Sequence, residues 1–214
     1  TSGGQALGFS DHGVTIASSS QAYRVEFAGA AAVQPVADRP GSADSAAQPG
    51  GEQALGRVTY ANLWPGIDLS YDAPAGALLR STYTLAPGAD PAAIRLRYNI
   101  PAAIAADGSL ELNYPVGAVR ESAPIAWQTR AGRQIPVAVA FQIHPAAAGA
   151  PEQVGFKVGA YDPALPLTID PVITWNTYLG GNGTDDIYEI AVDASDNLYV
   201  VGNSTTTWGS PVRA

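Results

Sequence analysis

The chain of 214 residues contains no cysteine and no methionine, and histidine is scarce. Without cysteine neither disulfides nor thiol chemistry can contribute in any compartment, so stability must come from packing and strand pairing. Because methionine is absent, Thr1 is not an initiator residue. We expect a mature product from which a signal peptide was removed, and a shortened form of a longer chain is the alternative.

Basic residues are also few, with 11 Lys and Arg against 19 Asp and Glu and a net charge of −8. Lys157 is the single lysine, and the arginines are spread from Arg24 to Arg213 without a cluster. Phosphate backbones and anionic lipid surfaces both require a basic patch, so we expect no nucleic-acid partner. No apolar run approaches the roughly 20 residues that span a bilayer, so we expect no membrane insertion.

Helical periodicity is lacking too, since 23 glycines and 17 prolines interrupt most windows long enough to carry it. Apolar and polar residues instead alternate with a period of two, which is typical of half-buried strands. The clearest runs are 23–27, 67–71, 94–98, 110–114 and 135–143. The pattern predicts an all-β, antiparallel, β-sandwich-like domain.

Turn residues separate these strands. Asp107-Gly108 is a candidate hairpin turn, and Pro65-Gly66, Pro87-Gly88 and Ala131-Gly132 mark further turns. Asp90-Pro91 predicts one helical turn over 90–93, with Asp90 as its cap.

The domain organisation follows from shifts in composition. Residues 31–53 are rich in Ala, Pro, Gly and Ser and have no large aromatic, which indicates a loop or linker. Prolines are then frequent from Pro163 to Pro171. We place a boundary there, between 1–170 and 171–214, and expect the two parts to share a strand.

Two stretches carry a family resemblance. The first covers 58–71, 85–91 and 94–96, and the second covers 154–156, 161–162, 166–171, 177–181 and 190–202. Together they resemble a bacterial surface family with an uncharacterised N-terminal β domain followed by SBBP repeats, named for the seven-bladed β-propeller. The resemblance implies that the C-terminal part is one propeller-blade-like β-hairpin unit, although relatives usually have glycine where Asp196 stands.

Oxygen ligands are concentrated in that hairpin. Asp185, Asp186, Asp193 and Asp196 form a candidate calcium site, and the alternative is that they are polar turn residues at sheet edges. We expect no other cofactor. His12 and His144 have no local partners for a metal site or a catalytic triad.

Paired carboxylates are candidate catalytic groups, because glycoside hydrolysis needs two acids at a suitable distance. The candidates are Asp68, Asp72, Glu111, Glu121 and Asp170. Alternation places Asp68 and Glu111 on the polar faces of ordinary strands, so we do not expect an enzyme. Most aromatic residues occupy core positions, and Trp208, in a polar run, is a candidate interface anchor.

These features favour an extracellular structural subunit of a homopolymeric surface assembly or filament, joined to other copies by strand pairing between subunits. The expected interface residues are Leu7, Phe9, Val14, Ile16, Ile187, Ile190, Leu198, Val200 and Trp208. The alternative is a surface adhesin or carbohydrate-binding module that recognises surface glycans, as a fragment of a longer β-propeller protein.

Overall fold

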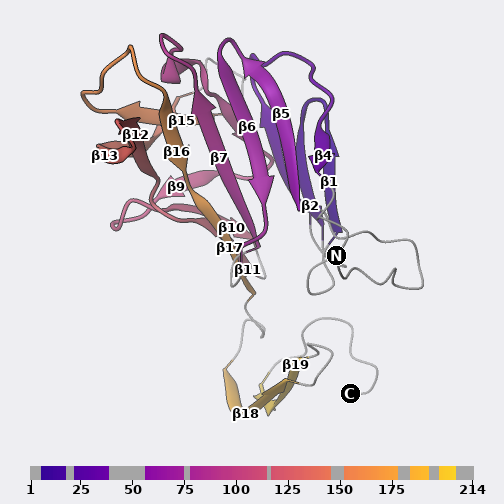
Figure 1. Cartoon of the computed structure of the whole chain (residues 1–214). Helices are drawn as coiled ribbons and strands as arrows, with labels where there is room; N and C mark the ends of the chain where they lie inside the picture. Colours follow the sequence, from indigo (N-terminus) through magenta and orange to yellow (C-terminus); the bar gives the residue numbers. More distant parts are fainter. Residues whose placement is uncertain are drawn as a thin grey trace.

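The computed structural model describes residues 6–17, 22–38, 56–74, 78–114, 117–145, 152–177, 184–192 and 198–205. Within these ranges the chain is all β except for one 3₁₀ turn, and the strands pair antiparallel throughout. Two large sheets and a separate two-stranded hairpin account for all the strands in the described residues (Figure 1). The prediction of an all-β, antiparallel fold is confirmed.

The first sheet has six strands in the described part of the chain, in the order β1-β2-β3-β8-β15-β14. Its strands are β1 (Ala6–Ser10), β2 (Gly13–Ala17), β3 (Ala22–Phe27), β8 (Leu96–Tyr98), β15 (Gln153–Val158) and β14 (Val139–His144). Strands β1 and β14 are its two edges.

The second sheet has eleven strands among the described residues. They are β4 (Val36–Asp38), β5 (Arg57–Trp64), β6 (Ile67–Asp72), β7 (Leu79–Leu85), β9 (Ala102–Ile104), β10 (Leu110–Tyr114), β11 (Gly117–Glu121), β12 (Ile125–Arg130), β13 (Arg133–Val137), β16 (Leu167–Asp170) and β17 (Val172–Thr177). Strand β4 lies within the stretch 31–53 that we expected to be a loop, and residues 39–53 are outside the described residues.

Pro171 is the point at which the second sheet divides into two arms. Strands β16 and β17 both pair with β7 in one continuous register, so they act as a single strand interrupted at Pro171. On the other side, β12 and β13 extend from β16, whereas β11, β10 and β9 extend from β17. The strand after the expected boundary therefore belongs to the large sheet.

Local sequence explains several of these elements. The 3₁₀ turn Pro91–Ala93 begins as predicted, with the Asp90 carboxylate accepting the Ala92 N–H at 2.9 Å. The β12–β13 hairpin turns at Ala131 and Gly132, both at positive φ. The alternating run 135–143 is split at Ala138, because β13 belongs to the second sheet and β14 to the first.

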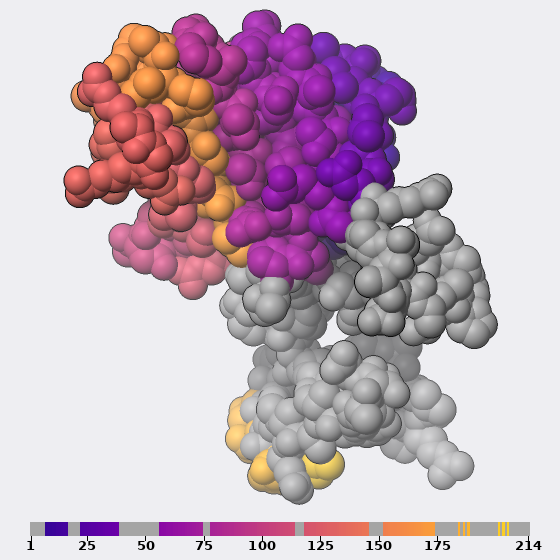
Figure 2. Space-filling view, viewed as in Figure 1, coloured from indigo at the N-terminus to yellow at the C-terminus, as the bar shows by residue number. Residues whose placement is uncertain are grey.

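The two sheets pack face to face, and one hydrophobic core lies between them. Aromatic rings join the layers: Phe27 meets Tyr60 at 5.1 Å and Trp64 at 6.0 Å between ring centroids, and Tyr83 meets Phe156 at 5.1 Å. The prediction that most aromatics face a core is confirmed for Tyr60, Trp64 and Tyr71, whereas Tyr188 is exposed. In Figure 2 the side chains of β5, β6 and β7 form one continuous outer surface.

The remaining strands, β18 (Asp185–Val192) and β19 (Leu198–Ser204), form a two-stranded sheet with a bulge between Ile187 and Glu189. Among the described residues neither strand pairs with any other element. No helix in the described part of the chain is long and apolar enough to cross a membrane.

Candidate functional site

Glu121 is buried in the core, and sequence reasoning did not foresee its surroundings. Glu121 lies on β11, is 3% exposed, and its side chain faces the first sheet. The hydroxyls of Tyr23 and Tyr98 both donate to its Oε1, at 2.7 Å and 2.9 Å. A single carboxyl thus bridges the two layers of the sandwich, because β3 and β8 belong to the opposite sheet.

Burial controls the ionisation of this cluster. Desolvation raises the pKa of Glu121 above its ordinary value of 4.5, while the two tyrosine hydrogen bonds act in the opposite direction. Burial, and then the nearby Glu121 carboxyl, raises the pKa of Tyr23 and of Tyr98 well above 10. A cavity of about 10 Å³ borders the cluster, a size that fits about one water molecule.

The other candidate acids lie away from Glu121, on outward-facing positions. Asp68 is exposed, and its Oδ1 accepts the Asn62 N–H at 2.6 Å within the β5–β6 turn. Glu111 is half-buried on β10. The outward placement predicted for both is confirmed, whereas Glu121 is buried.

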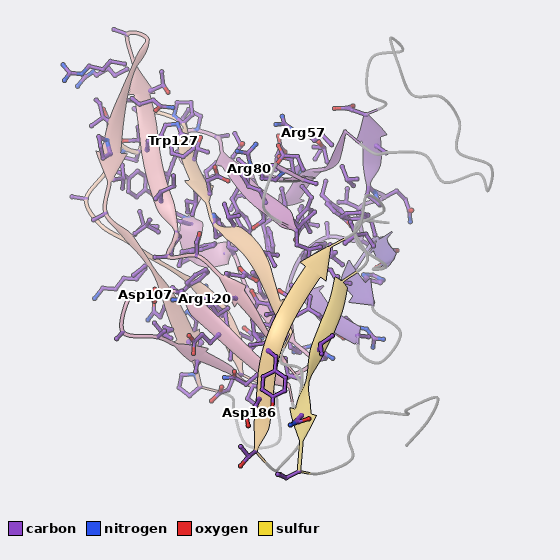
Figure 3. All side chains as sticks on the ribbon, turned by 90° about the horizontal axis from the view of Figure 1, so that it is seen from below. Arg57, Arg80, Asp107, Arg120, Trp127 and Asp186 are labelled. Carbon is purple, nitrogen blue, oxygen red and sulfur yellow. The ribbon has the colours of Figure 1, made fainter. Side chains whose placement is uncertain are left out.

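Asp72 and Asp170 belong to a cluster on the outer face of the second sheet. Arg80 donates to both oxygens of Asp72, at 2.9 Å and 2.7 Å, and its Nε lies 3.9 Å from Asp170. Arg57 reaches Asp72 from β5 at 3.2 Å. Figure 3 shows Arg57 and Arg80 close together on this face.

The pKa values of the two carboxyls shift in opposite directions, for different reasons. Hydrogen bonding from Arg80 lowers the pKa of Asp72 below 3.8, whereas burial raises the pKa of Asp170. The two acids are linked through a shared arginine across neighbouring strands, which stabilises pairing of β5, β6, β7 and β16. A second outer pair joins Asp107 to Arg120 (Figure 3).

The candidate calcium ligands fall partly outside the described residues. Asp185 and Asp186 lie on β18, and Asp186 is exposed (Figure 3). Asp193 and Asp196 lie outside the described residues. Within the described ranges, no group of three or more His, Cys, Asp or Glu side chains is arranged to hold a metal ion.

The histidines lie at opposite ends of the first sheet. His12, at the β1–β2 turn, has its Nε2 3.5 Å from Asp11. His144 is the last residue of β14. Its Nε2 is buried next to Gly155 on β15 and has no hydrogen-bond partner. Burial, and then the charge of Arg95, lowers the pKa of His144.

The expected interface residues divide into two groups. In the first sheet, Val14 and Ile16 are buried in the chain's own core, and Leu7 and Phe9 are half-buried against it. In the hairpin, Ile187 and Ile190 lie on β18, and Leu198 and Val200 lie on β19. Trp208 lies outside the described residues.

A groove of about 440 Å³ lies at the point where the chain crosses between the sheets. Its lining residues are Tyr98, Asn99, Ile100, Pro101, Ala102, Glu152 and Val154. The Asn99 side chain is already engaged, since it accepts the Arg24 N–H and donates to the Ala22 carbonyl, both at 2.8 Å. Glu152 supplies an exposed carboxyl at the rim.

The fold and these sites define a two-sheet β domain followed by a propeller-type hairpin. Residues 5–172 match the family described as "Domain of unknown function (DUF7948)", and residues 174–207 match a β-propeller repeat, SBBP. The chain belongs to the DUF7948 family and carries one SBBP repeat after that domain. Among curated proteins and among solved structures, none matches this chain.

Proposed function

We propose that the protein is an extracellular structural subunit, joined to other copies of itself by β-strand pairing through its β-propeller repeat. The observation that carries this proposal is the isolated β18–β19 sheet, whose strands pair only with each other in the described residues. A propeller blade has about four strands, so further strands are needed to complete a blade around this hairpin.

The exposed side chains of the hairpin support the same proposal. Tyr188 is 64% exposed and Val201 is 61% exposed, in a pair of strands with no covering layer in the described residues. Two-stranded sheets are marginally stable in water and gain most when they add strands or a packed face. Strands from a second copy would supply both, and an uncapped head-to-tail contact would extend into a filament.

A lysine on the hairpin tests this proposal. Val201→Lys places a solvated charge on the exposed face, opposite Glu189 in the register, so the hairpin itself is expected to persist. Thr84→Lys is the matched control, because Thr84 is exposed on the central strand β7 and the charge change is the same.

We expect size-exclusion chromatography with light scattering to give an oligomeric mass for the unsubstituted protein and for Thr84→Lys. Val201→Lys is expected to lower the fraction of oligomer at least several-fold. Equal association by both variants would argue against the hairpin as the contact.

A surface adhesin or carbohydrate-binding module is the second candidate, and the 440 Å³ groove favours it. Binding to a glycan array that is lost in Glu152→Ala or Trp208→Ala, by a protein that stays monomeric, would support this function in place of assembly.

A further inference from the structure

The two large sheets end in five edge strands within the described residues, and these edges differ in how they are protected. Natural sheets protect edges with charges, prolines, short strands or covering segments. Strand β4 is short, follows Pro35 and contains Asp38. Strand β13 contains Arg133 and Pro136, and β9 is a three-residue strand that follows Pro101.

Strand β14 is uncharged at neutral pH but is covered. It continues directly from β13 through Ala138, whose carbonyl accepts the Gly159 N–H at 2.7 Å. Strands β9 and β12 of the other sheet lie against it. The sandwich is therefore closed on this side.

Strand β1 has none of these protections. Its sequence, Ala-Leu-Gly-Phe-Ser, contains no charge and no proline, and it pairs only with β2. Strand β1 packs against the second sheet, because the centroid of the Phe9 ring lies 5.7 Å from that of Tyr71 on β6. Its outer main-chain groups meet no strand in the described part of the chain, at the side of the sandwich opposite β12 and β13 (Figure 1).

The repeat contains one strand that matches this edge chemically. Strand β19, Leu198–Ser204, has neither charge nor proline, whereas β18 carries Asp185, Asp186 and Glu189. Because every copy has a net charge of −8, an acidic strand would be repelled by another copy more than an uncharged one. Strand β19 is the donor with the lower electrostatic cost.

We propose that β19 of one copy adds to the outer edge of β1 in the next copy, extending the six-stranded sheet across the subunit boundary. This inference rests on the proposed assembly and names its two surfaces. Main-chain hydrogen bonds between β19 and β1 supply the affinity, and the contact is head-to-tail, because it joins two different surfaces of the chain.

The absence of cysteine permits a direct test by disulfide trapping in the full chain. Gly8 is exposed on β1, and a Cβ there would meet only Thr15 atoms at 3.9–4.0 Å, so Gly8→Cys is tolerated by the fold. It is mixed with Tyr199→Cys, Val201→Cys or Asn203→Cys, which sample every second position on β19. The control is Ala140→Cys, an exposed position on the other edge strand, β14.

We expect mild oxidation to give a covalent heterodimer for Gly8→Cys with one or two of the β19 variants, and none for Ala140→Cys. A chain that carries both cysteines of the reactive pair should give a ladder of multimers. Gly8→Lys should also lower the oligomeric fraction several-fold, whereas Ala140→Lys should leave it unchanged.

The outcomes separate the two proposals. Oligomers by light scattering without a Gly8 crosslink, or with an equal Ala140 crosslink, would overturn the β1–β19 contact and leave the assembly proposal standing. A monomer at every concentration would overturn both.

Discussion

At the residue scale, the buried Glu121 is the most unusual group in the described structure. Two tyrosine hydroxyls satisfy one of its oxygens, yet desolvation still raises its pKa. A carboxyl whose pKa is raised by folding keeps its proton in the folded state while the unfolded chain has lost it. Its ionisation therefore reduces the free energy of unfolding as the pH rises above its ordinary value near 4.5.

Replacing this carboxyl should change how stability depends on pH. Glu121→Gln keeps an acceptor oxygen for Tyr23 and Tyr98 but cannot ionise, so its stability relative to the unsubstituted protein should increase as the pH rises from 4.5 to 8. Glu121→Leu leaves both hydroxyls without a partner and should be less stable than Glu121→Gln by about 1–3 kcal/mol.

Urea unfolding followed by tryptophan fluorescence, repeated at several pH values, measures both effects. A difference between Glu121→Gln and the unsubstituted protein that does not change with pH would show that Glu121 ionises normally in the folded state.

Residue chemistry was only partly predictable. The sequence showed Glu121 among five acids, but not that its side chain lies between two tyrosines 98 and 23 positions away. Such contacts depend on which strands from distant parts of the chain become neighbours, and alternation alone does not specify this. The turn residues, in contrast, were predicted correctly, because Gly66, Gly88, Gly108 and Gly132 adopt positive φ for local steric reasons.

At the element scale, the stretch that carries the family resemblance forms structural contacts. In the β5–β6 turn the Asn62 side chain accepts the Gly66 N–H at 2.7 Å, and its own N–H bonds Asp68. Trp64 donates from its indole nitrogen to the Ala28 carbonyl at 3.2 Å. These residues of the stretch therefore hold the β5–β6 turn and its contact with the opposite layer.

Gln128 fixes the loop before β16 and offers a second test. Its amide nitrogen donates to the carbonyls of Asp162 and Leu165 at 2.8 and 3.1 Å, and its oxygen accepts the Asp162 N–H at 2.8 Å. Gln128→Leu removes these partners from a buried position and should lower the free energy of unfolding by about 2–3 kcal/mol.

Gln128→Leu should also speed amide hydrogen exchange at Asp162. The control is Thr129→Leu, at the exposed neighbouring position. It should change the free energy of unfolding by no more than about 0.5 kcal/mol and leave the exchange rate at Asp162 unchanged. Unchanged exchange at Asp162 would mean that other contacts hold this loop.

Strand connectivity was the part of the fold that sequence did not predict. The alternating run 135–143 looked like one strand, yet β13 and β14 enter different sheets. The boundary predicted at Asp170-Pro171 included a strand shared by the two parts, and β16 and β17 pair with β7 in one register on both sides of Pro171. Proline lacks a donor and interrupts a strand locally, but β7 pairs on both sides of it, so the sheet continues.

At the scale of the whole molecule, a two-sheet domain is followed by a hairpin that pairs with nothing else in the described residues. The domain satisfies its own core, and most of its sheet edges carry protection against further pairing. The unprotected strands, β1 and β19, lie near opposite ends of the sequence. The proposed β1–β19 contact would therefore join two different surfaces of the chain.

The molecular mass of the unsubstituted protein in solution tests assembly most directly. Light scattering across a hundredfold range of concentration should give a weight-average mass that rises through multiples of 22.0 kDa. A mass of 22.0 kDa at every concentration would contradict assembly through strand pairing.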